Sequence, residues 1–320
     1  MRAVQVKEFG GPEVLMPVEL PDPEPEAGEV VIDVAYADTL FVETQVRSGW
    51  GREYFDVTPP YVPGGGVSGT VTETGPGVPA EWLGRRVVSH VRGSYASRAV
   101  AAVSGLAVVP EEVDLLTAAA LVHDGVTGAG LIERTAITRG ERVLILGASG
   151  GMGTLLVQLA AARGARVVGL ARGAEKTSLV RELGATAALD ITTEDWLLST
   201  REALGGSADV VLDGVGGELG ASAFPLTADG GRFSAHGAPS GDFARLDTRE
   251  AANRGIRLFG IGDVQFGPAE LGRLAGYALG EAANGRLRAV IGEVFPLERA
   301  REAHSAVEQR GMVGKVLLEC

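Results

Sequence analysis

The chain of 320 residues has one cysteine, Cys320, and only three lysines. A single cysteine excludes an intrachain disulfide and a cysteine-based zinc site. No apolar run is long enough to cross a bilayer, and the opening MRAVQVKEFGG lacks the continuous apolar region of a signal peptide. We therefore expect a cytoplasmic protein that does not enter a membrane.

Basic charge is also scarce, because 29 Lys and Arg face 41 Asp and Glu, which gives a formal net charge of −12. An acidic protein repels a phosphate backbone, so we do not expect nucleic acid as a partner. Basic runs, low-complexity segments and fixed-period repeats are absent. The length and the 45% hydrophobic content predict a globular chain of two domains.

Residues 142–170, which read RVLILGASGGMGTLLVQLAAARGARVVGL, are the most informative stretch. An apolar run, a glycine cluster, a segment with helical spacing and a second apolar run predict a strand, a turn, a helix and a strand. This unit holds dinucleotides, because the glycines let the backbone approach the pyrophosphate and the helix offers free N–H groups. An ordinary turn is the alternative, since the glycines follow AxGxxG rather than GxGxxG. The predicted cofactor contacts are Ala148, Ser149, Gly150, Gly151, Met152 and Gly153.

The residues at the end of the second strand indicate whether the cofactor is NAD or NADPH. Sites for NAD usually carry Asp or Glu there, bonded to the ribose 2′-hydroxyl. This chain instead has Arg172 and, one helical turn later, Lys176. An arginine can bind a 2′-phosphate through two N–H groups and a lysine adds a point charge, so we predict NADPH. A solvated loop cation and a charged helix start are the alternatives.

Two kinds of sequence pattern divide the chain. Residues 1–118 carry short apolar runs separated by Gly and Pro, which predict strands, and the tail returns to strands after 286. Between them, six apolar runs alternate with helices, which is the full strand count of a doubly wound parallel sheet. We predict an α/β chain with a β-rich domain at 1–118 and 286–320 and an inserted cofactor domain at 119–285. The six strands are expected at 143–146, 166–170, 186–189, 209–213, 231–235 and 256–260, and later helices at 268–284 and 297–309.

Several motifs, in their order and spacing, resemble those of a medium-chain dehydrogenase/reductase of the zinc-free quinone oxidoreductase (NADPH:quinone reductase) branch. They are the opening MRAVQVKEFGGPEVL, the turn GASGGMG, DGVG at 213–216, GGRF at 230–233 and GKVL at 314–317. The resemblance covers nearly the whole chain. It implies a GroES-like catalytic domain, a Rossmann domain, a homodimer, and hydride transfer from NADPH to a quinone or an α,β-unsaturated carbonyl.

Further cofactor contacts are expected at the carboxyl ends of the later strands, which border the ligand crevice of a doubly wound sheet. Plain turns are the alternative, and the resemblance favours contact. It also implies that Thr127 contacts the nicotinamide amide and that Lys315 lies near the cofactor. The alternatives are helix capping for Thr127 and a solvated strand end for Lys315. The contacts expected at the strand ends are Gly214, Val215, His236, Gly237, Phe259, Gly260 and Ile261.

Zinc-dependent relatives carry three ligands whose positions can be compared with this chain. Leu40 stands in place of their cysteine, Gly65 and Gly66 replace their His-Glu pair, and only His123 matches the third ligand. One ligand of three cannot hold zinc, so we predict no metal. Zinc-free relatives often have Asn at the Leu40 position and Tyr at the Gln45 position, and this chain has neither.

Reduction of a quinone needs a proton or a hydrogen bond for the developing oxyanion. The resemblance implies that His123 faces the nicotinamide, and a histidine can act as an acid near neutral pH, so His123 is the predicted proton donor. Asp124 orients it or caps the following helix. A histidine without a chemical role is the alternative. Tyr54 is a second candidate donor, in a loop that lines the cleft of the family, where simple packing is the alternative.

The departures from the family pattern leave the acceptor open. They include Asp190, at a position where many relatives place a tyrosine near the 2′-phosphate. An enoyl thioester or a biosynthetic enoyl intermediate is an alternative substrate, and an NADPH-binding sensor without turnover is an alternative function. We further expect Arg47 in a surface or interdomain ion pair, His304 on a helix surface, and dimer contacts through the strand at 257–260.

Overall fold

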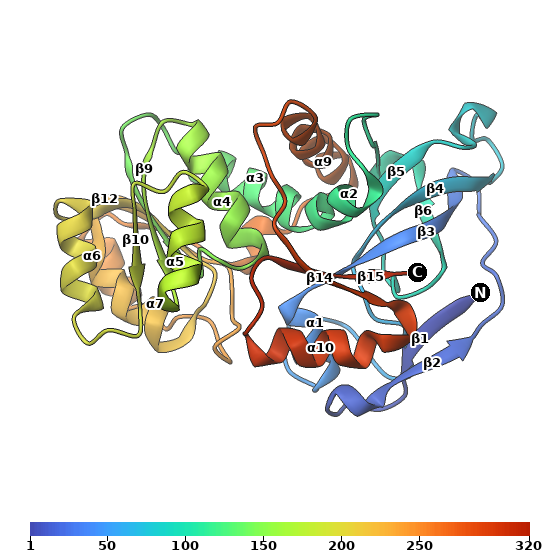
Figure 1. Ribbon diagram of the computed structural model, residues 1–320, viewed down its shortest axis with the longest axis horizontal. Coiled ribbons are helices and arrows are strands. Elements are labelled where there is room, and N and C mark those ends of the chain that lie inside the picture. The colour runs from blue at the N-terminus through green and yellow to red at the C-terminus, as the bar shows by residue number, and fades with distance from the viewer. The chain divides into compact units, whose positions relative to one another are not determined.

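The computed structural model describes all residues, 1–320, and they group into two compact units. Unit 1 contains Met1–Val126, Gly267–Gly285 and Ala289–Cys320, and unit 2 contains Thr127–Phe266 and Arg286–Arg288. The predicted α/β class, with a β-rich part and a doubly wound parallel sheet, is confirmed (Figure 1).

Unit 1 is built on a seven-stranded sheet in the order β14-β15-β3-β4-β5-β7, with β6 paired to β3. The pairs are antiparallel except β14 with β15, which run parallel. A separate antiparallel hairpin joins β1 and β2. The strands of unit 1 are β1 (Arg2–Val6), β2 (Leu15–Glu19), β3 (Glu29–Thr39), β4 (Gly66–Thr74), β5 (Arg86–His90), β6 (Arg98–Ala102), β7 (Leu106–Val108), β14 (Ile291–Pro296) and β15 (Lys315–Glu319).

Four helices belong wholly to unit 1, and a fifth, α3 (Asp124–Arg134), begins there and continues into unit 2. The helix α2 packs on β3, β4 and β5, and α10 packs on α1, β14 and β15. The four are α1 (Phe41–Arg47), α2 (Leu115–Val122), α9 (Pro268–Ala283) and α10 (Ala300–Gln309), with short 3₁₀ turns η1 (Pro12–Val14), η2 (Ala80–Trp82), η3 (Val103–Gly105) and η6 (Leu297–Arg299).

The units differ from the predicted domains at two helices and at Arg286–Arg288, which belongs to unit 2. The helix α2 crosses the predicted boundary at residue 118 and packs on β3, β4 and β5 of unit 1. The helix α9, which the prediction assigned to the cofactor domain, packs on α2, β7 and η3 of unit 1. Its buried residues are Leu274, Ala275, Ala278 and Leu279. Helical periodicity in a sequence identifies an apolar face but not the sheet that this face covers.

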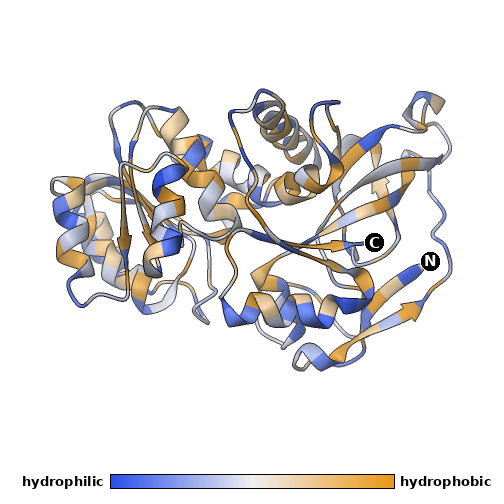
Figure 2. Ribbon diagram, in the orientation of Figure 1, coloured by the Kyte–Doolittle hydropathy of each residue, from blue (hydrophilic) through white to orange (hydrophobic).

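Unit 2 contains a parallel sheet of six strands in the order β10-β9-β8-β11-β12-β13, the doubly wound arrangement expected from six alternating strands. The central strand β8 is a continuous apolar run because helices cover both faces of such a sheet. Figure 2 shows these strands largely in the hydrophobic colour and polar residues on α5 and α6. The strands are β8 (Arg142–Leu146), β9 (Arg166–Ala171), β10 (Ala187–Asp190), β11 (Ala208–Asp213), β12 (Thr227–Ala235) and β13 (Arg257–Phe259).

Two helices of unit 2 end at a glycine in the left-handed conformation. After α4, Gly164 has a φ of +78°, and α6 is closed by Gly205 with a φ of +68°. No single helix is long and apolar enough to cross a membrane, and only α2 and α3 taken together, across a bend of 47°, reach that length and apolarity. The helices are α4 (Gly151–Ala162), α5 (Gly173–Glu182), α6 (Trp196–Leu204), α7 (Gly217–Ala223) and α8 (Thr248–Asn253), with η4 (Phe224–Leu226) and η5 (Ile261–Val264).

Candidate active site

The glycine turn between β8 and α4 brings the backbone of the strand and the helix into direct contact. A Cβ atom added to Gly153 would lie 2.1 Å from the Gly147 carbonyl oxygen, so no side chain fits there. The left-handed conformation falls on Gly147, with a φ of +71°, and Gly150 N donates to Gly147 O at 3.0 Å. Ala148 lies outside the left-handed region, which explains why the pattern tolerates alanine.

The helix α4 begins at Gly151, and its N-cap Gly150 provides no side-chain acceptor for the first turn. The amide groups of Gly151, Met152 and Gly153 therefore have no acceptor within the helix. Free amides at a helix N-terminus bind anionic oxygens. The turn thus has the close backbone packing and the free donors that a pyrophosphate needs, so the residues present fit a dinucleotide.

The end of β9 carries the predicted cation. Arg172 is the N-cap of α5, and it is exposed, with its backbone in an extended conformation. Lys176 follows one turn later and is partly buried. The neighbouring strand contributes an acid, because Asp190 at the end of β10 lies in register with Ala171. Its carboxylate accepts from Thr192 N at 3.0 Å and Thr192 Oγ1 at 2.8 Å. Hydrogen bonds from the backbones of Thr192 and Gly173 hold the pKa of Asp190 below its ordinary value.

The ends of β11 and β12 form a second compact turn pair. The backbone N–H groups of His236 and Gly237 both donate to the Asp213 carbonyl oxygen, at 3.1 and 3.2 Å. A Cβ atom on Gly237 would lie 2.3 Å from the Gly214 carbonyl oxygen. Four predicted contacts, Gly214, Val215, His236 and Gly237, are therefore brought together. The predicted Phe259 is the last residue of β13 and lies in register with Ser234 of β12; Gly260 and Ile261 follow it.

The carboxylate of Asp213 holds this turn pair together through hydrogen bonds, although the sequence alone predicted no separate role for it. Its Oδ1 accepts from Val215 N and Gly216 N, both at 2.9 Å, while Oδ2 is buried without a partner. Burial raises the pKa of Asp213 to about 6. His236 lies beside it with Nδ1 3.1 Å from Ser234 Oγ, and burial lowers the pKa of this ring to about 4, so it is neutral. The acid at the start of DGVG, residues 213–216, was the available signal in the sequence.

His123 is the C-cap of α2 in unit 1, and its side chain is 31% exposed. Its Nδ1 is buried and lies 3.5 Å from Asp124 Oδ1, beyond a normal hydrogen bond but within ion-pair range. Its ring lies 5.6 Å from that of His90. Burial, with a smaller effect from His123, lowers the pKa of His90 to about 3, so His90 is a neutral neighbour.

Lys315 is buried, so the solvated strand end considered for it is wrong. Its Nζ lies 2.5 Å from Asp38 Oδ1 and 3.0 Å from Asp124 Oδ2. Burial opposes its charge, yet the two carboxylates raise the pKa of Lys315 above its ordinary value. Burial also opposes the charge of Asp124, but Lys315 and His123 lower the pKa of Asp124 to about 2. The ammonium is thus already held by two carboxylates, and contact between Lys315 and a cofactor stays a prediction.

The second candidate donor, Tyr54, is 44% exposed. Its ring lies 6.1 Å from that of Trp50, which in turn lies 6.4 Å from Phe55. The three aromatic side chains therefore cluster in the loop that follows α1. Thr127 is buried in α3, and both its contact with the cofactor and a role for Tyr54 in proton donation stay predictions.

Two further expectations are wrong about location. His304 is completely buried rather than on a helix surface, and Arg47, at 1% exposure, is not a surface residue, although it forms the expected kind of ion pair, with Glu308 of the same unit. Arg47 Nη1 lies 3.2 Å from His304 Nδ1, and Tyr95 Oη lies 2.9 Å from His304 Nε2. Tyr95 Oη then donates to Glu43 Oε2 at 2.7 Å. These side chains come from distant parts of the sequence, so no local pattern reveals them.

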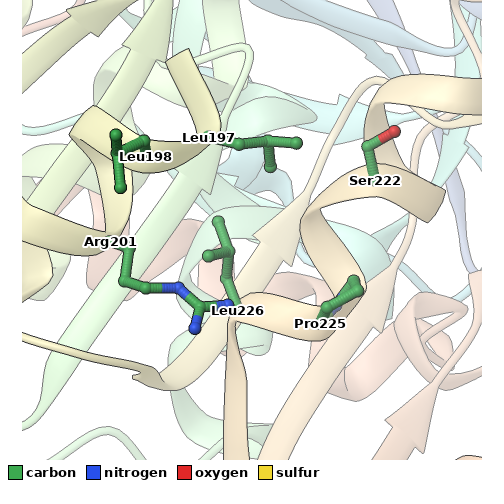
Figure 3. A pocket seen from close by; sticks show the side chains of 6 residues that line it. All are labelled: Leu197, Leu198, Arg201, Ser222, Pro225 and Leu226. Atoms are coloured by element: carbon green, nitrogen blue, oxygen red, sulfur yellow. The ribbon is translucent and has the colours of Figure 1, made fainter. Parts of the chain in front are cut away.

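A pocket of about 180 Å³ lies elsewhere in unit 2, between α6 and the consecutive elements α7 and η4 (Figure 3). It contains none of the predicted site residues. Its walls are Leu197, Leu198, Arg201, Ser222, Pro225 and Leu226.

Comparison with known proteins identifies the family. Residues 26–113 match the alcohol dehydrogenase GroES-like domain and residues 151–267 match the zinc-binding dehydrogenase family. The quinone oxidoreductase of Rattus norvegicus is 31% identical over 325 residues, which are 99% of this chain and 97% of the relative. A 2-haloacrylate reductase of Burkholderia sp is 28% identical over 328 residues, 99% of this chain and 98% of the relative.

Two solved structures match this chain over its full length. A mycobacterial protein complexed with NADPH is 32% identical, with a TM-score of 0.92, and all of both chains is covered. Escherichia coli quinone oxidoreductase complexed with NADPH is 26% identical, with the same TM-score of 0.92 and complete coverage of both chains. The chain therefore belongs to the medium-chain dehydrogenase/reductase family, among its quinone oxidoreductases.

Proposed function

We propose that this oxidoreductase uses NADPH, without zinc, to reduce a quinone or an α,β-unsaturated carbonyl. The protein is an enzyme, and its cofactor is NADPH. The observation that carries the proposal is the glycine turn with free amides at α4, followed by Arg172 where an NAD site would carry an acid. Two relatives of known structure, both complexed with NADPH, support the same cofactor.

When bound, NADPH supplies the hydride, and the residues of this chain bind and orient it. The amides of Gly151, Met152 and Gly153 would bind the pyrophosphate, and Arg172 with Lys176 would bind the 2′-phosphate. The turn pair at Gly214–Val215 and His236–Gly237 would leave room for the ribose, with Phe259–Ile261 beside it and Thr127 at the nicotinamide amide. His123 supplies the proton that the reduced acceptor takes up on its oxyanion, and Tyr54 is the second candidate for that step.

The residue types at the metal positions of the family support chemistry without zinc. Leu40, Gly65 and Gly66 offer no ligand atoms in their side chains. No three His, Cys, Asp or Glu side chains of the chain gather in a way that could hold a metal ion. The developing negative charge on the acceptor must then be met by hydrogen-bond donors such as His123.

An activated carbon–carbon double bond in place of a quinone is the second candidate acceptor. The similarity to a 2-haloacrylate reductase favours it, at 28% identity over nearly the whole of both chains. An enoyl thioester belongs to the same class of acceptor. We also propose a cytoplasmic homodimer that pairs through β13, because β13 is the edge strand of the unit 2 sheet.

The test is the loss of NADPH absorbance with a panel of acceptors: benzoquinone, phenanthrenequinone, a 2-alkenal, a 2-haloacrylate and crotonyl-CoA, with NADH as the control donor. Turnover with the quinones alone supports the quinone assignment. Turnover only with the alkenal, the haloacrylate or the thioester moves the enzyme to double-bond reduction. Binding of NADPH without turnover of any acceptor contradicts the proposed activity and favours a sensor.

A further inference from the structure

The junction between α2 and α3 places a histidine and an acid side by side. His123 is the single residue between Val122, where α2 ends, and Asp124, where α3 begins. Asp124 is 5% exposed, and its two oxygens face different partners. Oδ2 lies 3.0 Å from Lys315 Nζ and Oδ1 lies 3.5 Å from His123 Nδ1. The acid therefore bridges a fixed cation and the predicted proton donor.

The cation at this junction is itself anchored. Lys315 is the first residue of β15, which lies between β14 and β3 in the unit 1 sheet (Figure 1). Asp38 on β3 holds the same ammonium at 2.5 Å. Burial holds the pKa of Asp38 above its ordinary value, and Asp124 adds to that rise. Taking several charged groups out of water is costly, and such a cluster rarely exists for stability alone.

The exposure of His123 defines which nitrogen can meet a substrate. Its Nδ1 is buried toward Asp124, whereas the side chain as a whole is 31% exposed. The exposed part of the ring therefore lies away from Nδ1. A carboxylate at Nδ1 favours a proton on that nitrogen, so the proton that is given up is the one that Nε2 carries when both nitrogens are protonated.

We propose that Lys315, acting through Asp124, is a positioning residue for His123. The ammonium, itself held by Asp38, fixes the Asp124 carboxylate beside the imidazole, and the carboxylate fixes the orientation and tautomer of the ring. The role rests on the proposed function, in which His123 is the proton donor. This positioning role, rather than contact with the cofactor, is then the reason why β15 begins with a lysine.

The experiment compares Lys315→Met, Lys315→Arg and Asp124→Asn with the wild type in the full-length protein. Misplacing a catalytic group by about 1 Å lowers turnover by about 100-fold, so we expect Lys315→Met to lower kcat by about that factor. The Kd for NADPH should stay unchanged, and Lys315→Arg should recover most of the turnover. In a His123→Ala background, Lys315→Met should lower kcat no further, because coupled residues are not additive.

Glu308→Gln is the matched control, because it breaks another partly buried ion pair of unit 1, that of Glu308 with Arg47. We expect it to lower the melting temperature without changing kcat. If Lys315→Met behaves in the same way, with stability reduced and kcat intact, Lys315 is merely structural and the proposal is wrong. A loss of NADPH affinity with kcat intact would likewise overturn it in favour of cofactor contact.

A readout without turnover separates this proposal from the proposed activity. Nitrogen-15 NMR of the His123 ring reports which nitrogen carries the proton, whether or not any acceptor is reduced. We expect the proton on Nδ1 in the wild type and a shift toward Nε2 in Asp124→Asn, whose near-identical shape avoids the folding risk of Lys315→Met. An unchanged ring spectrum in Asp124→Asn refutes the positioning role, even in an enzyme that turns over quinones.

Discussion

Glu43 provides the sharpest test of the buried charges in unit 1. Glu43 is the last acceptor in a chain of hydrogen bonds that begins at Arg47, and the direction of this chain is fixed because Arg47 can only donate. His304 must therefore accept at Nδ1 and donate from Nε2 to Tyr95, which in turn donates to Glu43 Oε2. Leu40 N donates to the same oxygen at 2.9 Å, while Oε1 is buried without a partner.

Glu43 should be difficult to ionise in this environment. Burial is the main reason, Asp38 adds repulsion, and together they raise the pKa of Glu43 from 4.5 to about 7 despite the donors Leu40 and Tyr95. The folded state therefore binds the proton more tightly than the unfolded state. Below about pH 4.5 both states are protonated, and above about pH 7 both are ionised, so stability falls as the pH rises between these values. The difference of the two pKa values corresponds to roughly 3 kcal/mol of unfolding free energy.

The perturbation is Glu43→Gln. Glutamine keeps an acceptor for Tyr95 and Leu40 and cannot ionise, so its unfolding free energy should lack this decline with pH. The assay is urea unfolding followed by fluorescence in a Trp196→Phe background, because the remaining tryptophans, Trp50 and Trp82, both belong to unit 1. From about pH 5 to about pH 8, the wild type should lose most of that roughly 3 kcal/mol relative to the variant.

Glu111→Gln is the matched control, because Glu111 is an exposed acid of the same unit. Its pH dependence should run parallel to that of the wild type. If Glu43→Gln also runs parallel to the wild type, Glu43 is ionised throughout this range and the reasoning from burial is refuted.

Three further predictions concern the cofactor and the donor. His123→Ala should lower kcat by about 100-fold or more, the contribution of a general acid, with an unchanged Kd for NADPH; unchanged turnover removes His123 from the mechanism. Arg172→Ala should raise the Kd for NADPH at least about 10-fold more than that for NADH, since a charged hydrogen bond is lost; an equal loss for both contradicts the phosphate role. Asp190→Asn should tighten NADPH by a few-fold but leave NADH unchanged, because a like charge near the phosphate is removed, with Asp195→Asn as the control; equal tightening of both cofactors would place Asp190 away from the phosphate.

The parts of the fold that were predictable from sequence are those encoded locally. The apolar run 143–146 of β8 is followed directly by a glycine, and the turn at Gly147–Gly153 is a contiguous motif. The strands β2 and β7 carry little signal, because β2 contains Pro17 and β7 has only three residues.

The polar networks of unit 1 could not be predicted, because their partners are far apart in the chain. Arg47 and His304 are separated by 257 positions, and Asp124 and Lys315 by 191. A histidine in a polar helix resembles a surface residue when its partners are unknown. Such contacts depend on the register between β15 and β3, in which Leu317 lies opposite Asp38.

The position of β15 also affects how the protein is made. Unit 2 is a continuous stretch of chain apart from three residues, so its sheet can form on the ribosome before the tail is synthesised. The sheet of unit 1 must wait, because β15 inserts between β14 and β3, and β3 was translated long before. Until β15 arrives, Asp38 and Asp124 also lack the cation that neutralises them. A nascent or truncated chain that stops before Gly314 would therefore expose an unfinished sheet and two uncompensated acids.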